Sequence, residues 1–265
     1  MLPRTHFFRA PKDRPRSAAT YSTEKNVTMA NKPTPQCALC TLRDRACRVE
    51  GGSGPDFCPT VNCAETIKRT VDEYNRPEIR EFARMASIQE AECYTDRDIK
   101  PYVLHPVKTR VQEICEFAKK MGYRKLGVAF CAGLHPEARA LTKILITQGF
   151  EVVSVVCKTG CTPKELIGLK DHEKVRTGEF ESMCSPIVQA AILNKEKTDF
   201  NVLVGLCVGH DSLFFKYSEA FTTVLVAKDR VLGHNPAGAL YTSGTYYARL
   251  LRPGIDPSKE DKYKR

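Results

Sequence analysis

The chain has 265 residues, 42% of them hydrophobic, and a formal net charge of +10. This length suits one large domain or a core domain with an attachment. The sequence contains no run of about 18 apolar residues, the length that a membrane-spanning helix requires. The basic residues form no stripe with interleaved aromatic residues, which argues against a nucleic-acid-binding protein.

Cysteine is frequent, with 12 residues in the chain. Secreted proteins built on disulfides are generally short, rich in loops and preceded by an apolar signal peptide. This sequence instead contains several predicted core strands and no apolar segment near its start. We therefore expect a reduced, cytoplasmic protein whose thiols bind metal or carry out redox chemistry.

Residues 1–34 are the first of five predicted regions. They contain many Arg, Pro and Ser residues, few acidic ones and no periodicity. Pro3, Pro11 and Pro15 would interrupt the amphipathic helix of an organellar targeting segment, and Met29 offers an alternative start. We interpret this region as a disordered basic extension.

A cysteine-rich module is predicted over residues 35–64. The spacing Cys37-x-x-Cys40 lets two thiolates bind one metal ion from a tight turn, and Cys58 is followed by Pro59. Zinc bound by four thiolates fits this pattern, and so does an iron–sulfur cluster. The loop has few apolar residues around which to fold, which argues against unligated cysteines. The candidate metal ligands are Cys37, Cys40, Cys47, Cys58 and Cys63.

Residues 65–122 are predicted to form a helical segment packed on the core. Apolar residues recur at helical spacing over 64–74, 78–93 and 107–121. Cys115 lies on the apolar face of the third helix, where core packing is its expected role.

Strands alternate with helices over residues 123–252, and a flexible tail is expected over 253–265. Three apolar runs of strand length end on a cysteine, and a fourth does not. The four runs cover 125–131, 151–157, 201–207 and 221–227, and the intervening or following helices are expected at 136–148, 187–194, 212–217 and 237–251. This alternation predicts a doubly wound α/β fold with a mainly parallel sheet of about four to five strands.

Thiols gather at one edge of this predicted sheet. With the strand order 2-1-3-4, Cys157, Cys131 and Cys207 end three adjacent strands, where α/β proteins bind ligands. The outer two strand ends lie roughly 9–10 Å apart, too far for one tetrahedral zinc ion. Either loop cysteines complete the shell or an iron–sulfur cluster bridges the ends. The expected cofactor-binding residues are Cys131, Cys157, Cys161, Cys184 and Cys207.

Charged and titratable residues follow the same strand ends. His210, Asp211 and His234 are candidates for metal ligation or proton transfer, although a histidine that braces a loop is an equally good interpretation. Lys158 and Arg230 would hold an anionic substrate, unless they are only exposed loop charges. The sequence contains no Gly-x-Ser-x-Gly motif and no phosphate-binding glycine loop, which argues against a serine hydrolase and against a nucleotide cofactor.

Several motifs together resemble a known family. They are Gly127–Cys131 with Glu137-Ala138, Val156–Cys161, Met183–Pro186, Gly205–Ser212 and Lys228–Pro236. The sequence resembles the domain of unknown function 1847, a family of cysteine-rich proteins expected to bind metal. The resemblance covers roughly residues 35–251 and implies metal binding, without a known reaction or ligand set.

These observations predict a metal-binding protein with thiolate ligands that holds an iron–sulfur cluster or zinc. The site at the strand ends would convert an unknown small molecule or serve a redox partner, and the N-terminal site would be structural or relay electrons. One alternative is a metal-stabilised binding or sensor module, so the sequence does not decide whether the protein is an enzyme. Another is a thiol–disulfide oxidoreductase using Cys157 and Cys161, although three residues separate this pair rather than the usual two. Neither nucleic acid nor a membrane is expected as a partner.

Overall fold

The computed structural model describes residues 33–252, so the tail predicted over 253–265 and nearly all of the extension predicted over 1–34 lie outside the described residues. The described chain divides into an N-terminal unit, residues 33–95, and an α/β unit, residues 96–252. The division therefore falls inside the predicted helical segment 65–122. Among residues 33–252, no helix combines the length and apolarity that a membrane crossing requires.

The N-terminal unit is mostly helical. Its elements are η1 (Cys37–Leu39), α1 (Pro59–Asn62), α2 (Ala64–Val71), η2 (Asp72–Asn75), α3 (Pro77–Glu92) and the short strand β1 (Tyr94–Thr95). The helices predicted over 64–74 and 78–93 are confirmed as α2 with η2 and as α3. Within residues 33–95, however, only Gln89 and Cys93 are buried. This unit therefore has almost no apolar core of its own.

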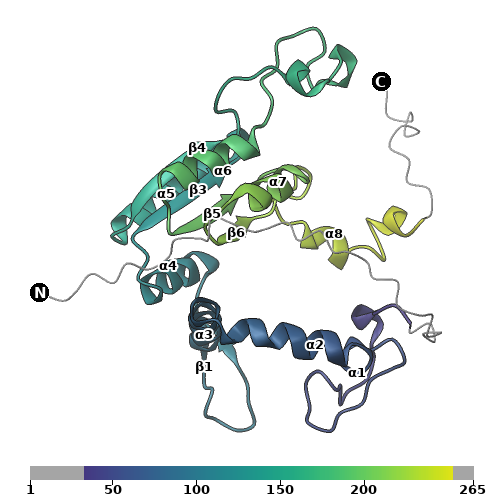
Figure 1. Ribbon diagram of the computed structural model, residues 1–265. Coiled ribbons are helices and arrows are strands. Elements are labelled where there is room, and N and C mark those ends of the chain that lie inside the picture. Colours follow the sequence, from purple (N-terminus) through teal and green to yellow (C-terminus); the bar gives the residue numbers. More distant parts are fainter. Residues whose placement is uncertain (1–32, 253–265) are drawn as a thin grey trace, which may run out of the picture. The chain divides into compact units, whose positions relative to one another are not determined.

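The α/β unit contains a four-stranded parallel sheet in the order β4-β3-β5-β6, which is the predicted 2-1-3-4 order and confirms the α/β fold class (Figure 1). The sheet consists of β3 (Lys125–Phe130), β4 (Glu151–Val156), β5 (Phe200–Val204) and β6 (Thr222–Val226), and the unit also contains the short strand β2 (His105–Pro106), which lies outside this sheet. Its helices are α4 (Arg110–Lys120), η3 (Ala132–Leu134), α5 (His135–Thr147), η4 (Lys164–Ile167), η5 (Asp171–Glu173), α6 (Pro186–Lys195), α7 (His210–Tyr217), α8 (Ala237–Tyr241) and η6 (Ala248–Leu251).

The central strands are covered on both faces, which is why their sequences are continuous apolar runs. All of β5 is buried, as is β3 from its second residue onward. Right-handed crossovers place α5 on one face of the sheet and α6 and α7 on the other, where these two helices pack against each other (Figure 1). Helix α4 begins at Arg110 rather than at the predicted 107, because Thr109 and Gln112 form a capping box before it.

Two further predicted elements of the α/β unit were wrong in extent. The strand predicted over 201–207 ends at Val204, because Gly205 adopts a positive φ of 68°. A Cβ atom at Gly205 would lie 2.7 Å from the Leu134 side chain, so the chain turns here through a residue that has none. Cys207 is consequently not a strand end.

The helix predicted over 237–251 is also interrupted. Only α8 and η6 are helical, and the residues between them compete for backbone hydrogen bonds. Thr242 Oγ1 donates to the carbonyl oxygen of Gly238 at 2.7 Å, and Ser243 Oγ donates to that of Leu240 at 2.9 Å. Side-chain bonds of this kind offer the backbone an alternative to a continuous helix.

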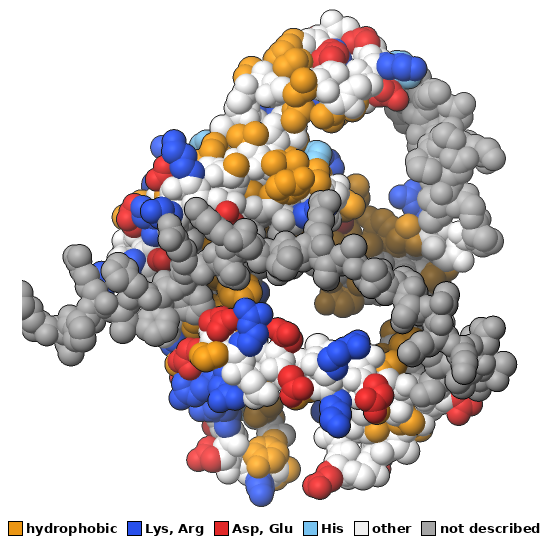
Figure 2. Space-filling view, viewed as in Figure 1, with side chains coloured by type: hydrophobic (Ala, Val, Ile, Leu, Met, Phe, Trp, Pro, Cys, Tyr) orange, Lys and Arg blue, Asp and Glu red, His pale blue; other side chains and the backbone are white. Residues whose placement is uncertain are grey.

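A long, mostly irregular segment, residues 157–185, connects β4 to α6 and contains η4 and η5. Lys174, whose side chain is 6% exposed, holds it together by pairing with Asp171 at 3.1 Å and with Glu165. Apolar side chains remain exposed on it, and they are part of the hydrophobic surface of this segment in Figure 2. The most exposed are Leu166, Ile167, Val175 and Phe180.

Candidate functional site

Three cysteines from separate segments converge at the carboxyl edge of the parallel sheet. Cys131 follows β3, Cys157 follows β4, and Cys184 lies two residues before α6. The thiol of Cys157 interacts with both other sulfurs, and its single S–H can be donated to either of them. Cys157 and Cys131 are buried, at 1% and 8% exposure, whereas Cys184 is half-buried. These three residues, here named the thiol row, therefore open to solvent mainly through Cys184.

Backbone bonds hold the row in place. The N–H of Ser185 donates to the carbonyl oxygen of Cys157 at 2.7 Å, which ties the start of α6 to the end of β4. The N–H of Ala132 donates to the Cys157 sulfur at 3.3 Å, and that of Gly133 donates to the Cys131 sulfur. These two amides can point at sulfurs because η3 turns the chain directly after β3.

Cys131 is held as a thiolate. Lys228, in the loop after β6, places its Nζ atom 2.7 Å from the Cys131 sulfur. Hydrogen bonds from Cys157 first, and then from Lys228 and Gly133, lower the pKa of Cys131 to about 4 despite its burial. A thiol with such a pKa is ionised at neutral pH.

Cys184 is the second thiolate. The hydrogen bond from Cys157 is the main cause that lowers its pKa to about 5, and the positive charges of Lys158 and His210 add to it. The Lys158 ammonium also donates to the carbonyl oxygen of Ser182 at 2.5 Å, which fixes it beside the segment that carries Cys184. A nucleophilic sulfur thus lies at the accessible end of the row.

Cys157 is the protonated member. Its contacts with Cys131 and Cys184, followed by burial, raise the pKa of Cys157. One S–H group can donate to a neighbouring thiolate, and ionising a third sulfur between two thiolates would add a like charge at short range. The row therefore consists of a neutral thiol between two cysteines whose pKa values are lowered.

Gln189 is a supporting residue that the sequence did not reveal. This side chain of α6 is fully buried, and its Nε2 atom donates to the carbonyl oxygens of Phe130 at 3.1 Å and Val155 at 2.7 Å. It thereby joins the ends of β3 and β4, immediately before Cys131 and Cys157. A polar residue on an otherwise apolar helix face was the available signal for Gln189. For Lys228, the signal was its position directly after a strand.

Two buried polar atoms near Cys184 have no hydrogen-bond partner within the described residues, namely Ser185 Oγ and His210 Nδ1. Ser185 is the N-cap residue of α6, but its hydroxyl makes no capping bond. His210 begins α7 and acts on Cys184 through its charge. Both atoms are available to a ligand at this end of the row.

The other two cysteines expected at this edge have different surroundings. Cys207 lies three residues beyond the end of β5, and its sulfur is 3.1 Å from the Arg230 guanidinium. Cys161 is exposed in the loop after β4, with a left-handed φ of 46°. In the described chain, the hydrogen bonds of the thiol row involve neither residue.

His234 and Asp211 make structural contacts. The N–H of Asp229 donates to His234 Nδ1 at 3.2 Å, so this histidine braces its loop. Asp211 Oδ1 accepts from the N–H groups of Gly209 at 2.9 Å and Ser212 at 2.7 Å, at the start of α7. Of the three candidates for proton transfer, His210 alone has a described interaction with the thiol row.

The five candidate ligands of the N-terminal unit are not gathered into a site. Cys37 and Cys47 are exposed, and the other three are half-buried. A backbone hydrogen bond from Val61 is the main cause that lowers the pKa of Cys58. Throughout residues 33–252, no three His, Cys, Asp or Glu side chains are arranged to hold a metal ion. The thiols suit zinc or an iron–sulfur cluster by donor type but not by this arrangement.

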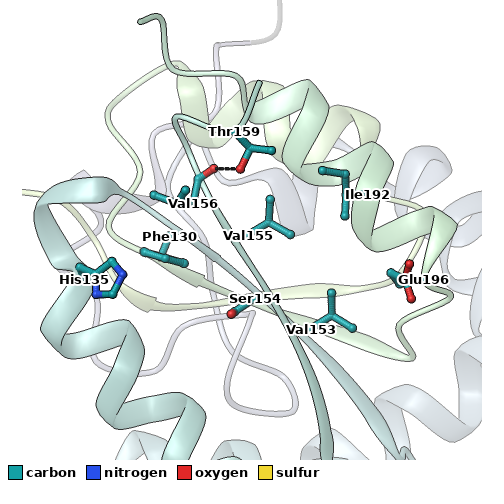
Figure 3. A pocket seen from close by; sticks show the side chains of 9 residues that line it. All are labelled: Phe130, His135, Val153, Ser154, Val155, Val156, Thr159, Ile192 and Glu196. Atoms are coloured by element: carbon teal, nitrogen blue, oxygen red, sulfur yellow. Dashed lines mark hydrogen bonds between the residues drawn. The ribbon is translucent and has the colours of Figure 1, made fainter. Parts of the chain in front are cut away.

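An open hollow of about 400 Å³ lies along the outer edge of β4 (Figure 3). No cysteine lines it, although Phe130 and Val156 directly precede two members of the thiol row. It adjoins the row but does not contain it. Its lining residues are Phe130, His135, Val153, Ser154, Val155, Val156, Thr159, Ile192 and Glu196.

Comparison with known proteins yields relatives without an assigned activity. A family model described as "Protein of unknown function (DUF1847)" matches residues 58–225, which include the whole thiol row. A protein of Methanocaldococcus jannaschii, described as uncharacterised, is 45% identical over 194 residues, which are 73% of this chain and 92% of the relative. No solved structure matches the chain significantly.

Proposed function

The chain belongs to the DUF1847 family, whose function is unknown, and we propose from its geometry that the thiol row is a dithiol–disulfide redox centre. One observation carries the proposal: the Cys157 thiol, whose backbone is tied to the start of α6 by the 2.7 Å bond from the Ser185 N–H, contacts both Cys131 and Cys184. The proposal replaces the pair Cys157 and Cys161 suggested by sequence spacing with the pair Cys157 and Cys184.

The row supplies each group that disulfide exchange requires. The Cys184 thiolate attacks a sulfur of an oxidised disulfide partner, forming a mixed disulfide and releasing one thiolate of that partner. The Cys157 proton passes to the Cys131 thiolate, to which it is already hydrogen-bonded. The Cys157 sulfur then attacks Cys184 and expels the second partner thiolate. The protein is oxidised by two electrons to a Cys157–Cys184 disulfide, and the partner is reduced by two electrons.

The exposure of each sulfur matches its role. Cys184, the half-buried member, is where a partner can make contact, whereas Cys157 is sealed inside. Cys131 is placed to accept the Cys157 proton because these two sulfurs interact directly, and Lys228 at 2.7 Å holds the Cys131 thiolate in position. A buried second thiol limits attack by other molecules on the mixed disulfide and leaves intramolecular closure as the faster step.

A redox titration tests this function. The full chain is equilibrated in mixtures of reduced and oxidised glutathione, quenched with acid, and its free thiols are counted by mass spectrometry. We expect a two-electron transition at a potential between about −270 and −120 mV, the range of dithiol enzymes. Cys157→Ser should abolish it, whereas Cys161→Ser, which changes an exposed thiol outside the row, should leave it unchanged. A transition lost with Cys161→Ser and kept with Cys157→Ser would reject the proposal.

A second candidate function concerns the N-terminal unit: we propose that five of its six cysteines, all except the buried Cys93, bind zinc or an iron–sulfur cluster that stabilises residues 33–95. The observation that favours it is that Gln89 and Cys93 are the only buried residues in this range. A unit without a sufficient apolar core generally needs a metal or covalent cross-links. Because the thiols are not gathered around a common point, we derive no reaction from this metal.

Elemental analysis tests the second candidate. Protein purified without oxygen should contain zinc, or iron with inorganic sulfide, in stoichiometric amount. Cys40→Ser should reduce that content, whereas Cys184→Ser should not. Metal-free protein with an intact N-terminal unit would exclude a structural metal.

A further inference from the structure

Cations accompany the sulfurs at the carboxyl edge of the sheet. Lys228 Nζ lies 2.7 Å from the Cys131 sulfur, and Arg230 Nη2 lies 3.1 Å from the Cys207 sulfur. The charge of Lys158 acts on Cys184. Two of these three cations belong to the loop after β6 and one to the loop after β4.

The carboxylates near these cations accept hydrogen bonds from backbone amides. Asp229, between Lys228 and Arg230, accepts from the N–H groups of Val231 at 2.9 Å and Leu232 at 2.8 Å. Asp211, beside His210, likewise bonds the backbone at the start of α7. These loops therefore present their ammonium and guanidinium groups to the sulfurs and use their carboxylates for turns.

Two buried polar atoms without a hydrogen-bond partner in the described chain lie at the Cys184 end of the thiol row. Ser185 is 2% exposed, and its Oγ atom has no partner in the described chain, nor does the buried His210 Nδ1 atom. A serine hydroxyl donates one hydrogen bond, and an imidazole nitrogen that carries a proton donates another. A carboxylate can accept from both donors, and its charge is opposite to that of Lys158.

We propose that the partner of the thiol row is a small anionic disulfide whose carboxylate binds beside Cys184, near Lys158, Ser185 and His210. This inference rests on the proposed redox function. Glutathione disulfide represents the class, since each half carries carboxylates next to a flexible thiol arm. A buried, unpaired donor is costly, so a ligand that supplies an acceptor is favoured at this position.

The exchange reaction itself frees the Lys158 ammonium to bind a carboxylate of the partner. When the Cys184 thiolate forms a mixed disulfide, its negative charge moves to the departing thiolate of the partner. Lys158 then loses the anion that it stabilised and can pair with a carboxylate of the half that remains attached. Before the reaction, the same cations offset the repulsion between a thiolate and an anionic disulfide.

Three disulfides of different charge test the inference on the reduced full chain. Glutathione disulfide is anionic, bis(2-hydroxyethyl) disulfide is neutral and cystamine is cationic. The rate of mixed-disulfide formation at Cys184 should follow that order, and the preference for the anionic probe over the neutral one should shrink with added salt. Lys158→Gln should lower this ratio about tenfold, in keeping with electrostatic steering, and Lys158→Arg should restore it.

The ratio separates charge recognition from reactivity. A higher pKa of Cys184 in Lys158→Gln would slow the anionic and neutral probes alike and would leave their ratio unchanged. An unchanged ratio, or cystamine as the fastest probe, would overturn the anionic partner while the neutral probe still reports a working redox centre. If none of the three disulfides reacts at Cys184, the redox function fails, and the inference fails with it.

Discussion

Cysteines serve the two units of this chain in different ways. In the α/β unit, Cys131 and Cys157 follow neighbouring strands and are fixed by backbone amides before any ligand arrives. In the N-terminal unit, five cysteines lie exposed or half-buried in a segment with two buried residues. In the α/β unit the fold positions the thiols, whereas in the N-terminal unit we expect thiols with a bound ligand to stabilise the fold.

The stability of the α/β unit does not depend on its sulfur atoms, because the unit has an apolar core. Leu126, Val128, Leu193, Val202 and Phe214 are all fully buried within it. Burying one such side chain contributes about 1.5–3 kcal/mol, so removing one sulfur atom leaves most of the stabilisation in place.

The largest effect is expected in the N-terminal unit. Chelation of bound metal, or Cys40→Ser, should increase amide hydrogen exchange in α2 and α3 by at least about 100-fold, because structural metals supply folding free energy. The strands β3 and β5 should exchange at an unchanged rate in the same sample. Equal protection of α2 and α3 with and without metal would remove the contrast between the units.

Loss of the central thiol should eliminate cross-linking within the α/β unit. In Cys157→Ser, neither Cys131 nor Cys184 has a sulfur partner within the row, so oxidation should yield no internal disulfide there. In Cys131→Ser, the Cys157–Cys184 pair remains and should still close, although more slowly for lack of the internal base. Peptide mapping after oxidation distinguishes the two variants, and an internal row disulfide in Cys157→Ser would contradict the arrangement.

The pH dependence of alkylation should differ between Cys184 and Cys115. The lowered pKa of Cys184, about 5, keeps it a thiolate as pH falls from 8 to 6, so its rate should change little there and halve near pH 5. Burial raises the pKa of Cys115, so its rate should fall about tenfold per pH unit throughout that range. Iodoacetamide pulses with mass spectrometry measure both sites, and parallel profiles would be evidence against a thiolate at Cys184.

A smaller change is expected when the cation at Cys131 is removed. Lys228→Met deletes the 2.7 Å contact and should raise the pKa of Cys131, because the thiolate loses a donor and a positive charge. A rise of one to two pKa units would leave Cys131 mostly ionised at pH 7 but should lower its alkylation rate at pH 5 by about twofold to tenfold. Lys143→Met, an exposed change on α5, is the control, and equal rates in both variants would exclude this role for Lys228.

Much of the α/β unit could be predicted because its signals are local. Apolar runs identify β3 to β6, and the alternation with helices leads to the strand order and hence to Cys131 beside Cys157. Other features depend on contacts that the sequence does not display. The Ser185 amide brings Cys184 to Cys157 through a backbone bond, and Gly205 ends β5 before Cys207 through its positive φ.

The most direct test is to oxidise the reduced full chain with one equivalent of glutathione disulfide, quench with acid and map the disulfides by peptide mass spectrometry. The account predicts that Cys157 joined to Cys184 is the first internal cross-link. Cys157 remaining reduced while exposed thiols such as Cys161 or Cys37 take up the oxidation would contradict it.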